Sequence, residues 1–387
     1  MSSRKTAPSL RFRGFSEPWE EKNAAILADY SKGNGYSKSD LTKTGTPIIL
    51  YGRLYTKYEF VINDVDTFAI PKRGSVYSQG NEVIIPASGE TAEDIARAAA
   101  IEKPGILLGG DLNILRPFDF INPLFLALAI SNGKPQKDLI KKAQGKSVVH
   151  IHNSDIQGII LTYPSKIEQN RIVEVFRNLD RLIALEQQKY DKLNTVKKSM
   201  LEKMFPQKGA KVPEIRFKGF SDPWEEKKLG EIFTFKYGNG NNNPSNGGKY
   251  PVFGAGGVQG GYSEYNAENS VIIGHMGDAG CVSWGEGKHY VTYNGTITKP
   301  KDHIFSAKFG YYLLFHMNLR KYRGGSGLPF LTYDMLTEME TVYPADRFET
   351  DCIEMVFSNL DRLITLQNRK IEKLRNLKKA CLEKMFV

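Results

Sequence analysis

The residues best suited to chemistry in this sequence are basic and polar side chains that gather in two groups. Lys and Arg neutralise phosphates, and Arg and Asn can read the edges of bases. The first half of the chain contributes Lys38, Lys43, Arg53, Tyr55, Lys57, Arg73, Lys141, Lys142 and Lys146. The second half contributes Tyr237, Asn239, Lys249, Arg320, Lys321, Arg323 and Ser326. We take these residues as candidate contacts to nucleic acid.

A single basic residue is more often a solvated surface charge than a ligand contact. The clusters just before Gly145 and Gly325 carry more weight, because they fall at the same position of two repeated segments. We expect both clusters in exposed loops, where binding residues are common.

Signatures of catalysis are missing from the sequence. It has neither a GxxxxGK[ST] phosphate loop nor an HExxH metal helix. The glycine-rich stretch 253–261 lacks a following helix, so we interpret it as a tight hairpin or a DNA-facing loop. Glu-Glu-Lys occurs at 20–22 and at 225–227, and we interpret both copies as solvated helix starts. We therefore predict no catalytic residue and no cofactor.

Metal-ligand spacing is also missing. The six histidines form no cluster, and the pair at His150 and His152 is expected to serve packing or a DNA contact. The three cysteines have no zinc-site spacing and fit a reducing cytoplasm, which is the predicted location. We therefore predict no metal.

Composition agrees with a soluble protein that binds a polyanion. The 387 residues carry a net charge of +10, and the sequence pI is about 9.2. No run of eighteen apolar residues exists, which excludes a transmembrane helix, and the N-terminus has no signal-peptide core. Charge alone leaves a merely basic protein as an equal alternative.

A duplicated helix must position these residues. Segments 176–205 and 357–386 are identical at eighteen of thirty positions. Apolar residues recur in both at spacings of three and four, which predicts long amphipathic helices. Both seams are interrupted at equivalent places, by Glu186 and Lys197 in one and by Gln367 and Lys378 in the other. We expect the helices to pair with each other, with these polar positions fixing the register.

The segments ahead of the helices are also duplicated. Residues 10–22 read LRFRGFSEPWEEK, and residues 215–227 read IRFKGFSDPWEEK. Between each of these lead-ins and its helix we expect a β-branched strand, a strand ended by proline and an apolar helix in the same order. A closing segment, 145–164, aligns without gaps to 325–344.

The predicted fold class is therefore α+β, with two similar domains alternating with two long helices that pair as an antiparallel coiled coil. The duplication gives the chain a pseudo-two-fold axis. The boundaries that we expect are 1–163 for the first domain with its lead-in, 164–206 for the first helix, 207–213 for a linker, 214–343 for the second domain with its lead-in and 344–387 for the second helix.

The phrases RFKGFSDPWEEKKLGEI and NLDRLITL…KLRNLKKACLEKMF resemble the specificity subunit of type I restriction-modification systems. The resemblance covers the chain from about residue 9 onward. It implies two target recognition domains, each reading one half of a split site in double-stranded DNA. It also implies a spacer of paired helices on which two methyltransferase (modification) subunits carrying S-adenosylmethionine dock. Restriction subunits, which are ATP-dependent translocases and nucleases, would join them, and no membrane is involved.

Two other functions stay open at this stage. A protein-only coiled-coil adaptor would use the same helices without DNA. A DNA-modifying enzyme would need an active site that the sequence does not reveal, since Asn122-Pro123-Leu124-Phe125 lacks the second proline of the adenine methyltransferase motif.

Overall fold

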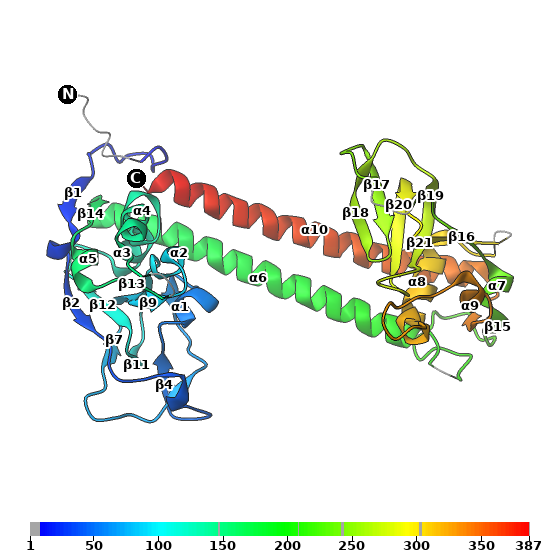
Figure 1. The fold of residues 1–387 in the computed structure, drawn as a ribbon, viewed down its shortest axis with the longest axis horizontal. Helices are drawn as coiled ribbons and strands as arrows, with labels where there is room; N and C mark the ends of the chain where they lie inside the picture. The colour runs from blue at the N-terminus through cyan, green and yellow to red at the C-terminus, as the bar shows by residue number, and fades with distance from the viewer. Residues whose placement is uncertain (1–7, 146–147, 208, 241–243, 302–303, 387) are drawn as a thin grey trace. The chain divides into compact units, whose positions relative to one another are not determined.

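The structure is a computed structural model, and it describes residues 8–145, 148–207, 209–240, 244–301 and 304–386. The chain forms two compact units (Figure 1). The first contains residues 1–185 and 371–387, and the second contains residues 186–370. Each long helix, α6 (Lys166–Met204) and α10 (Arg347–Met385), therefore contributes one part to each unit.

The first unit is built on two five-stranded sheets. One has the order β2-β12-β8-β10-β5, and its strands are β2 (Ala28–Lys32), β12 (Leu112–Pro117), β8 (Glu82–Pro86), β10 (Ala99–Ile101) and β5 (Val61–Ile62). The other has the order β3-β6-β4-β11-β7, with β3 (Leu41–Thr42), β6 (Phe68–Ala69), β4 (Thr46–Ile49), β11 (Pro104–Leu108) and β7 (Tyr77–Gln79). Two-stranded pairs join β1 (Glu20–Asn23) to β14 (Ile160–Tyr163) and β13 (Val149–His150) to β9 (Ser88–Gly89).

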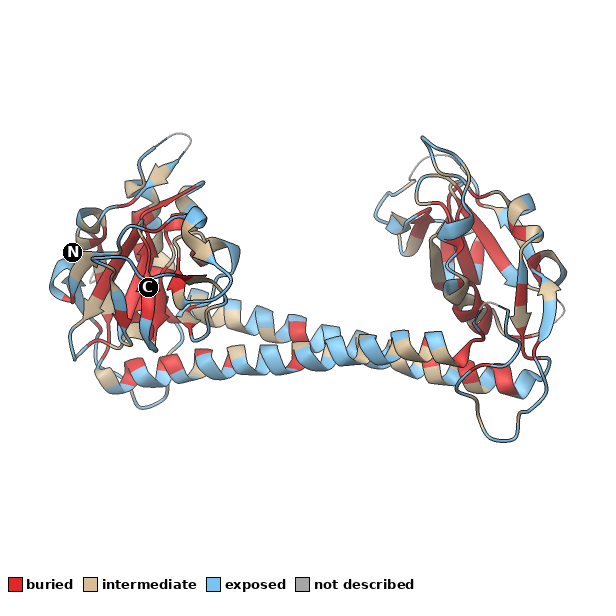
Figure 2. Ribbon diagram, turned by 90° about the horizontal axis from the view of Figure 1, so that it is seen from below, coloured by how far each residue is buried: buried red, intermediate tan, exposed pale blue. Residues whose placement is uncertain are grey.

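Short helices cover the sheets of the first unit. They are η1 (Ala24–Ile26), η2 (Lys38–Asp40), α1 (Arg53–Thr56), α2 (Ala92–Ile95), α3 (Pro123–Ile130), α4 (Gly133–Lys142) and α5 (Asn153–Gln157). Asn122 caps α3 by accepting hydrogen bonds from the backbone N–H groups of Leu124 and Phe125. Helix α3 is apolar around most of its circumference and is buried against the first sheet. Figure 2 shows that buried residues gather inside this unit.

The second unit is built on one six-stranded sheet of order β16-β21-β19-β20-β17-β18. Its strands are β16 (Phe233–Tyr237), β21 (Gly295–Pro300), β19 (Ala267–Gly274), β20 (Val282–Val291), β17 (Tyr250–Gly254) and β18 (Gly257–Tyr262). A separate pair joins β15 (Glu225–Lys228) to β22 (Glu340–Tyr343). The helices besides α10 are α7 (Leu229–Ile232), α8 (Ala307–Met317), η3 (Leu319–Tyr322) and α9 (Tyr333–Thr337). Strands β17 and β18 confirm the hairpin expected at the glycine-rich stretch.

The shared landmarks of the two repeats are confirmed. Strand β8 corresponds to β19, strand β12 to β21, and helix α3 to α8. In each unit these elements are followed by a short helix and a strand, α5 and β14 or α9 and β22. The α+β fold class and the two similar units are therefore as the sequence predicted.

The expectation of helix starts at the two Glu-Glu-Lys sequences is wrong. Glu20 and Glu225 instead begin strands β1 and β15, which pair antiparallel with β14 and β22. The residue before each, Trp19 or Trp224, is buried and anchors the strand in the core. Alternating burial cannot be read from four residues that are nearly all polar, so the sequence pattern gave no strand signal.

A buried ion pair fastens each lead-in to the start of a long helix. Arg11 donates two hydrogen bonds to the Glu168 carboxylate, at 2.7 and 2.8 Å, and Arg216 does the same to Glu349 at the same distances. Both glutamates are 1% exposed. Removing either arginine would leave a buried carboxylate without its partner, so these pairs fix the geometry of the lead-ins.

The C-terminal end of each long helix packs against the lead-in of the other repeat. In the first unit the N–H of Leu10 donates to the carbonyl of Lys384, and in the second the N–H of Ile215 donates to that of Lys203. The phenylalanine that follows each helix is buried, Phe386 beside Phe125 and Phe176, and Phe205 beside Trp224. Among the described helices, none has a stretch apolar and long enough to cross a membrane.

Replacing Phe386 with alanine should destabilise the first unit by about 3 kcal/mol, because a buried aromatic ring is lost from a packed core. Urea unfolding followed by fluorescence would measure the shift. Leu377→Ala is the control, since Leu377 lies near the end of α10 in the same unit and is 51% exposed. Equal midpoints for the two variants would contradict the assignment of Phe386 to this core.

Candidate nucleic-acid interface and helical seam

Four loops of the second unit meet on one surface. The N–H of Asn239 donates to the carbonyl of Val291 at 3.0 Å, and the N–H of Tyr293 donates to that of Gly240 at 2.7 Å. The N–H of Leu331 donates to the carbonyl of His275 at 2.8 Å. The N–H of His275 donates to the carbonyl of Asn294 at 2.7 Å and connects the two pairs of segments, so residues distant in sequence share one surface.

Aromatic side chains fill the centre of this surface. The ring of Tyr237 packs against His275, Tyr293 and Tyr333, with centroids 4.3, 5.6 and 5.1 Å away. Tyr293 and Tyr333 are more than 40% exposed, whereas His275 is buried and its Nδ1 bonds to the carbonyl of Leu331. The exposed tyrosines offer flat faces and hydroxyl groups, which suit contacts to sugars and bases.

The cations of the second unit are not equally available. Arg320 forms a bidentate pair with Asp278, at 3.0 and 2.6 Å, and this pair lowers the pKa of that carboxyl. Lys321 and Arg323 are exposed, and no ion pair with another described residue involves them. Ser326 lies in the exposed loop that follows. Lys249 lies apart from these loops, before β17, with its ammonium group 4.8 Å from the centre of the Tyr250 ring.

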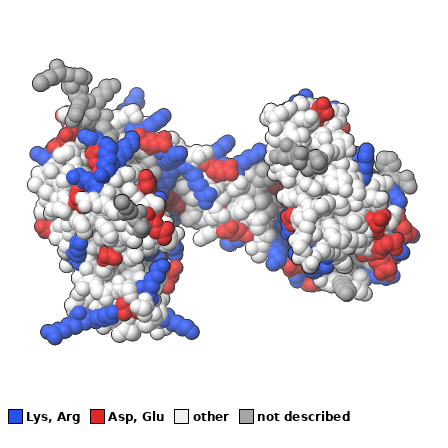
Figure 3. Space-filling model, in the orientation of Figure 1, with Lys and Arg blue, Asp and Glu red and all other residues white. Residues whose placement is uncertain are grey.

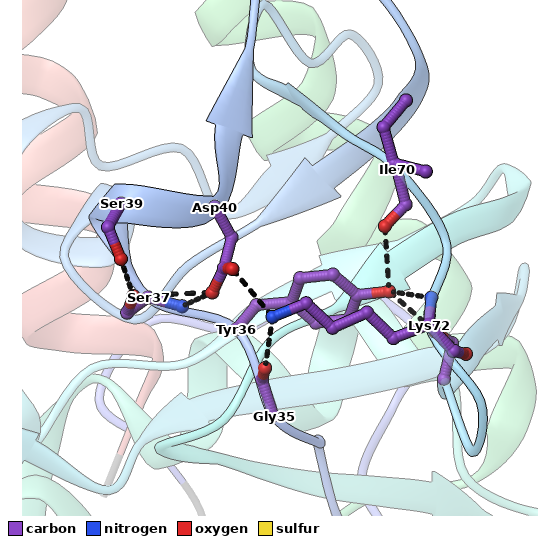
Figure 4. A network of polar contacts seen from close by, with 8 residues as sticks. Gly35, Tyr36, Ser37, Ser39, Asp40, Ile70 and Lys72 are labelled. Carbon is purple, nitrogen blue, oxygen red and sulfur yellow. Dashed lines mark hydrogen bonds and ion pairs between the residues drawn. The ribbon is translucent and has the colours of Figure 1, made fainter.

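In the first unit a polar network joins the loop after β2 to the loop after β6 (Figure 4). The hydroxyl of Tyr36 accepts from the N–H of Lys72 at 2.8 Å. The Lys72 ammonium group donates to Asp40 at 2.6 Å and to the carbonyl of Gly35 at 3.3 Å. Lys72 is thereby used to hold the two loops together.

The candidate cations on these loops point outward. Lys38, Lys43 and Arg73 are exposed, and no hydrogen bond or ion pair with another described residue involves their side chains. Figure 3 shows Lys and Arg side chains projecting from this end of the first unit, around β4. The network fixes the loops while leaving their charges free for phosphates.

Other candidates in the first unit are engaged within the fold. Arg53 bonds to Asp66, Glu59 and the carbonyl of Asp64, and Lys57 bonds to Asp66. Lys57, then Arg53, holds the pKa of Asp66 down at about 2. Tyr55 is half-buried near Tyr51, and burial raises its pKa. The charges of Arg53 and Lys57 are therefore largely balanced in the free protein.

The cluster before Gly145 is helical. Lys141 and Lys142 form the last turn of α4, and Lys146 lies outside the described residues. Lys141 is 3.8 Å from Asp138, and its side chain remains 77% exposed. Arg320 and Lys321 likewise lie on the short helix η3. The expectation of loops is wrong at these four positions, although the two clusters do occupy equivalent places.

One carboxylate receives side chains from both long helices. Gln367 of α10 donates to Glu186 of α6 at 2.6 Å and to the Glu186 carbonyl at 2.8 Å. Lys189 and Lys370, which are equivalent residues of the two repeats, each lie 3.0 Å from the same carboxylate oxygen. The bond from Gln367, followed by those from Lys370 and Lys189, lowers the pKa of Glu186 to about 2.

The second pair of polar seam residues forms matching ion pairs. Lys197 lies 2.5 Å from Asp361, and Lys378 lies 2.5 Å from Asp180. The two lysines are equivalent in the repeats, and so are the two aspartates. Each bond joins α6 to α10 within one unit, so the predicted role of these positions in helix pairing and register is confirmed.

In the described part of the chain, no three His, Cys, Asp or Glu side chains gather as a metal site requires.

Comparison with known proteins identifies the family. The model of the type I restriction modification DNA specificity domain matches residues 16–195 and again 221–376. The chain belongs to this family.

A curated relative matches part of the chain. The putative type I restriction enzyme MjaX specificity subunit of Methanocaldococcus jannaschii is 28% identical over 219 residues. That match covers 54% of this chain and 46% of the relative, so the chain spans about half the length of this curated protein.

Solved structures share the fold. The S subunit of a type I restriction-modification system from M. genitalium has a TM-score of 0.68 at 17% identity and covers 98% of this chain and 99% of its own. A second structure, titled for complex assembly and conformational transition of the type I R-M system, has a TM-score of 0.56 at 14% identity and covers 95% and 97%. At these identities the likeness concerns the fold of the specificity-domain family.

Sequence reasoning missed several residues of the candidate interface. Tyr293 and Tyr333 are exposed beside Tyr237, yet they lie in two segments with no common motif. The position of Tyr293 just after β20 was a usable signal, because loops at strand ends carry binding residues. Their exposure depends on how the loops meet, which no local pattern encodes.

Glu186→Gln should make this specificity-domain protein less stable at neutral pH and less sensitive to acid. Because the folded pKa of Glu186 is depressed, its contribution is fully present above the unfolded pKa, near 4.5, and is lost as pH falls toward about 2. Urea midpoints of wild type and variant should therefore differ at pH 7 and converge toward pH 2. Gln367→Glu is a matched comparison: two carboxylates would face each other, so this variant should also be less stable than the wild type at pH 7, and acid should restore part of its stability by protonating one of them. A constant difference between wild type and Glu186→Gln at all pH values would contradict the proposed network.

Proposed function

We propose that this chain is the DNA-sequence-specificity subunit of a type I restriction-modification complex. Each unit would read one half of a bipartite site in double-stranded DNA. The observation that carries this proposal is the duplication of the candidate interface. Both units place unpaired or exposed cations just before the same turn, Lys141 in one and Lys321 and Arg323 in the other.

Eleven of the candidate DNA contacts fall into three classes under this proposal. Lys38, Lys43, Arg73, Lys321 and Arg323 would neutralise phosphates, because their charges are exposed and unpaired among the described residues. Tyr237, Asn239 and Ser326 would contribute to reading bases or sugars, since they lie on the surface formed by the four loops. Arg53, Lys57 and Arg320 could contact DNA only by leaving acidic partners, so we assign them to loop positioning first.

We also propose that the chain performs no catalysis. Two methyltransferase (modification) subunits carrying S-adenosylmethionine would supply methyl transfer, and restriction subunits would supply ATP-driven translocation and cleavage. Neither a nucleotide loop nor a metal-binding helix is present in the sequence. Such a complex would act in the cytoplasm, where its DNA is.

The long helices would dock the modification subunits. In the second unit Leu363, Leu366 and Val196 are 50, 49 and 47% exposed, and in the first unit Leu182, Leu185 and Leu377 are 44, 42 and 51% exposed. Each of these residues precedes a seam position by one, so each points to the same flank of its helix. A row of exposed leucines on one flank is typical of a site for another helix.

The helices would also set the spacing between half-sites. Each has 39 residues and is therefore roughly 58 Å long. Half-sites one turn of duplex apart are roughly 34–36 Å from centre to centre, so helices of this length suffice to separate two reading units.

The experiment that tests the proposal is co-purification with a modification subunit, followed by mapping of methylated adenines. A bipartite motif is the expected result. Exchanging residues 23–160 for those of a relative should change one half-site only. A change in both halves, or a continuous motif, would overturn the assignment of one half-site to each unit.

Lys321→Ala and Arg323→Ala should each weaken duplex binding and reduce the slope of log affinity against log salt by about 1, because each removes one phosphate contact. Fluorescence anisotropy across a salt series measures this slope. Lys228→Ala is the control, since Lys228 is tied to Glu338 at 2.6 Å and lies outside the candidate interface. Absence of salt-dependent duplex binding by the wild type would instead favour a protein-only adaptor. Methyl transfer by the purified chain alone would favour an enzyme.

Leu363→Asp combined with Leu366→Asp should lower the affinity for the modification subunit at least about tenfold, because two buried charges would face an apolar helix. Pull-down titration measures the loss. Thr365→Asp is the matched control, since it adds the same charge to the opposite flank of α10, where the residue is exposed. Undiminished assembly of the double variant would exclude this flank as the docking surface.

A further inference from the structure

In the second unit a short turn carries an exposed apolar side chain, and the described residues at the same place of the first unit make matching contacts. In the second unit Gly324 and Phe330 exchange two backbone hydrogen bonds, at 2.9 and 3.0 Å, and close the loop Gly325-Ser326-Gly327-Leu328-Pro329. The base of this loop is fastened to the segment after β19, because the N–H of Gly277 donates to the carbonyl of Pro329 at 3.1 Å. Leu328 is 57% exposed. We call this residue, and the residue aligned with it in the first unit, the tips.

The described residues of the first unit repeat the backbone contacts that close this loop. Gln144 and His150 exchange two backbone hydrogen bonds, at 3.1 and 2.8 Å, and β13 pairs with β9 behind them. Val148 aligns with Leu328 and is 51% exposed. An isolated exposed apolar residue is ordinary, but the same exposed position in two diverged repeats calls for a common cause.

Each turn is preorganised by a glycine. Gly145 and Gly325 adopt φ values of +131° and +86°, which side chains rarely allow. A Cβ atom on either glycine would collide with a carbonyl oxygen, that of Val148 in one unit and that of Leu328 in the other. The close approach of the glycine holds the apolar residue at the tip of the turn before any ligand binds.

Positive charge precedes both tips. Lys321 and Arg323 come directly before Gly324, and Lys141 and Lys142 come directly before the residues that lead to Gln144. Lys321, Arg323 and Lys141 are exposed. An apolar side chain next to exposed cations suits a polyanion that has apolar groups between its charges. Duplex DNA is such a polyanion, because its bases lie between two rows of phosphates.

We propose that Val148 and Leu328 enter a groove of the duplex and pack on an apolar part of a base, while the neighbouring cations hold the phosphates. The inference rests on the proposed function, because it requires that both units bind DNA. The apolar part of the base has two sources. It is either the methyl group of thymine in the major groove or the face of a base whose stacking has been opened.

The test compares Leu328→Ser and Val148→Ser in the full chain, using a duplex that the wild type selects from a random library. Each variant should bind this duplex about tenfold more weakly, since an apolar contact is lost. The dependence of affinity on salt should stay unchanged, which separates the tips from the phosphate-binding cations. Repeating the selection should show loss of sequence preference in one half of the motif for each variant.

Matched controls come from exposed apolar residues elsewhere in the same units. Val258→Ser in the second unit and Ile26→Ser in the first replace residues that are 63 and 55% exposed, and both should bind as the wild type does. Leu328→Met should retain affinity because it keeps an apolar tip. Thermal melting should be unchanged in all five variants, because none of the replaced side chains is buried.

Two modified duplexes distinguish the sources of the apolar contact. If the tip contacts the thymine methyl group, replacing thymine with deoxyuridine should weaken wild-type binding by the same factor as Leu328→Ser does. With 2-aminopurine in the site, binding should raise fluorescence for the wild type and not for the variant if the tip opens the stack. Wild-type affinity in both tip variants would overturn the inference and leave the proposed function intact, whereas failure of the wild type to bind any duplex would overturn both.

Discussion

The carboxylate of Glu186 is the interaction on which the pairing of the long helices depends. It receives Gln367, Lys189 and Lys370, so residues of both helices converge on one negative charge. Two glutamates at this position would repel each other, and two glutamines would leave the lysines without a carboxylate. Because one helix has Glu and the other has Gln at this position, pairing of α6 with α10 is favoured over pairing of either helix with a copy of itself. The Lys197–Asp361 and Lys378–Asp180 pairs then form only in this register.

The framework and the candidate interface follow different rules in the two units. The buried pairs of Arg11 with Glu168 and of Arg216 with Glu349 have the same geometry, and the strands and helices behind them correspond. The surfaces that they carry differ, since one unit adds a second five-stranded sheet and the other curls six strands into one sheet. A fixed framework with divergent surfaces is what a family of DNA specificity domains requires, because each member needs different base contacts on the same support.

The sequence predicted the parts of the fold that local patterns encode. Apolar spacing revealed α6 and α10, and proline-terminated β-branched runs revealed β12 and β21. The strand β1 was not predictable, because its four residues are polar and exposed, and it is held by Trp19 before it and by pairing with β14 far along the chain. The same limit applied to the interface. Arg53 and Lys38 look alike in sequence, yet only the folded chain brings Asp66 and Glu59 to Arg53, whereas no described residue pairs with Lys38.

The docking of α10 on the first lead-in has a consequence for the order in which the protein can fold. Met385 and Phe386 belong to the core of the first unit, yet the ribosome makes them after the whole second unit. The first unit therefore cannot complete its core during its own synthesis and must hold an open site until residues 371–386 emerge. A chain interrupted anywhere in the second half would leave the first unit unfinished and open to proteases. Completion of the core of the first unit is thus tied to synthesis of the second unit.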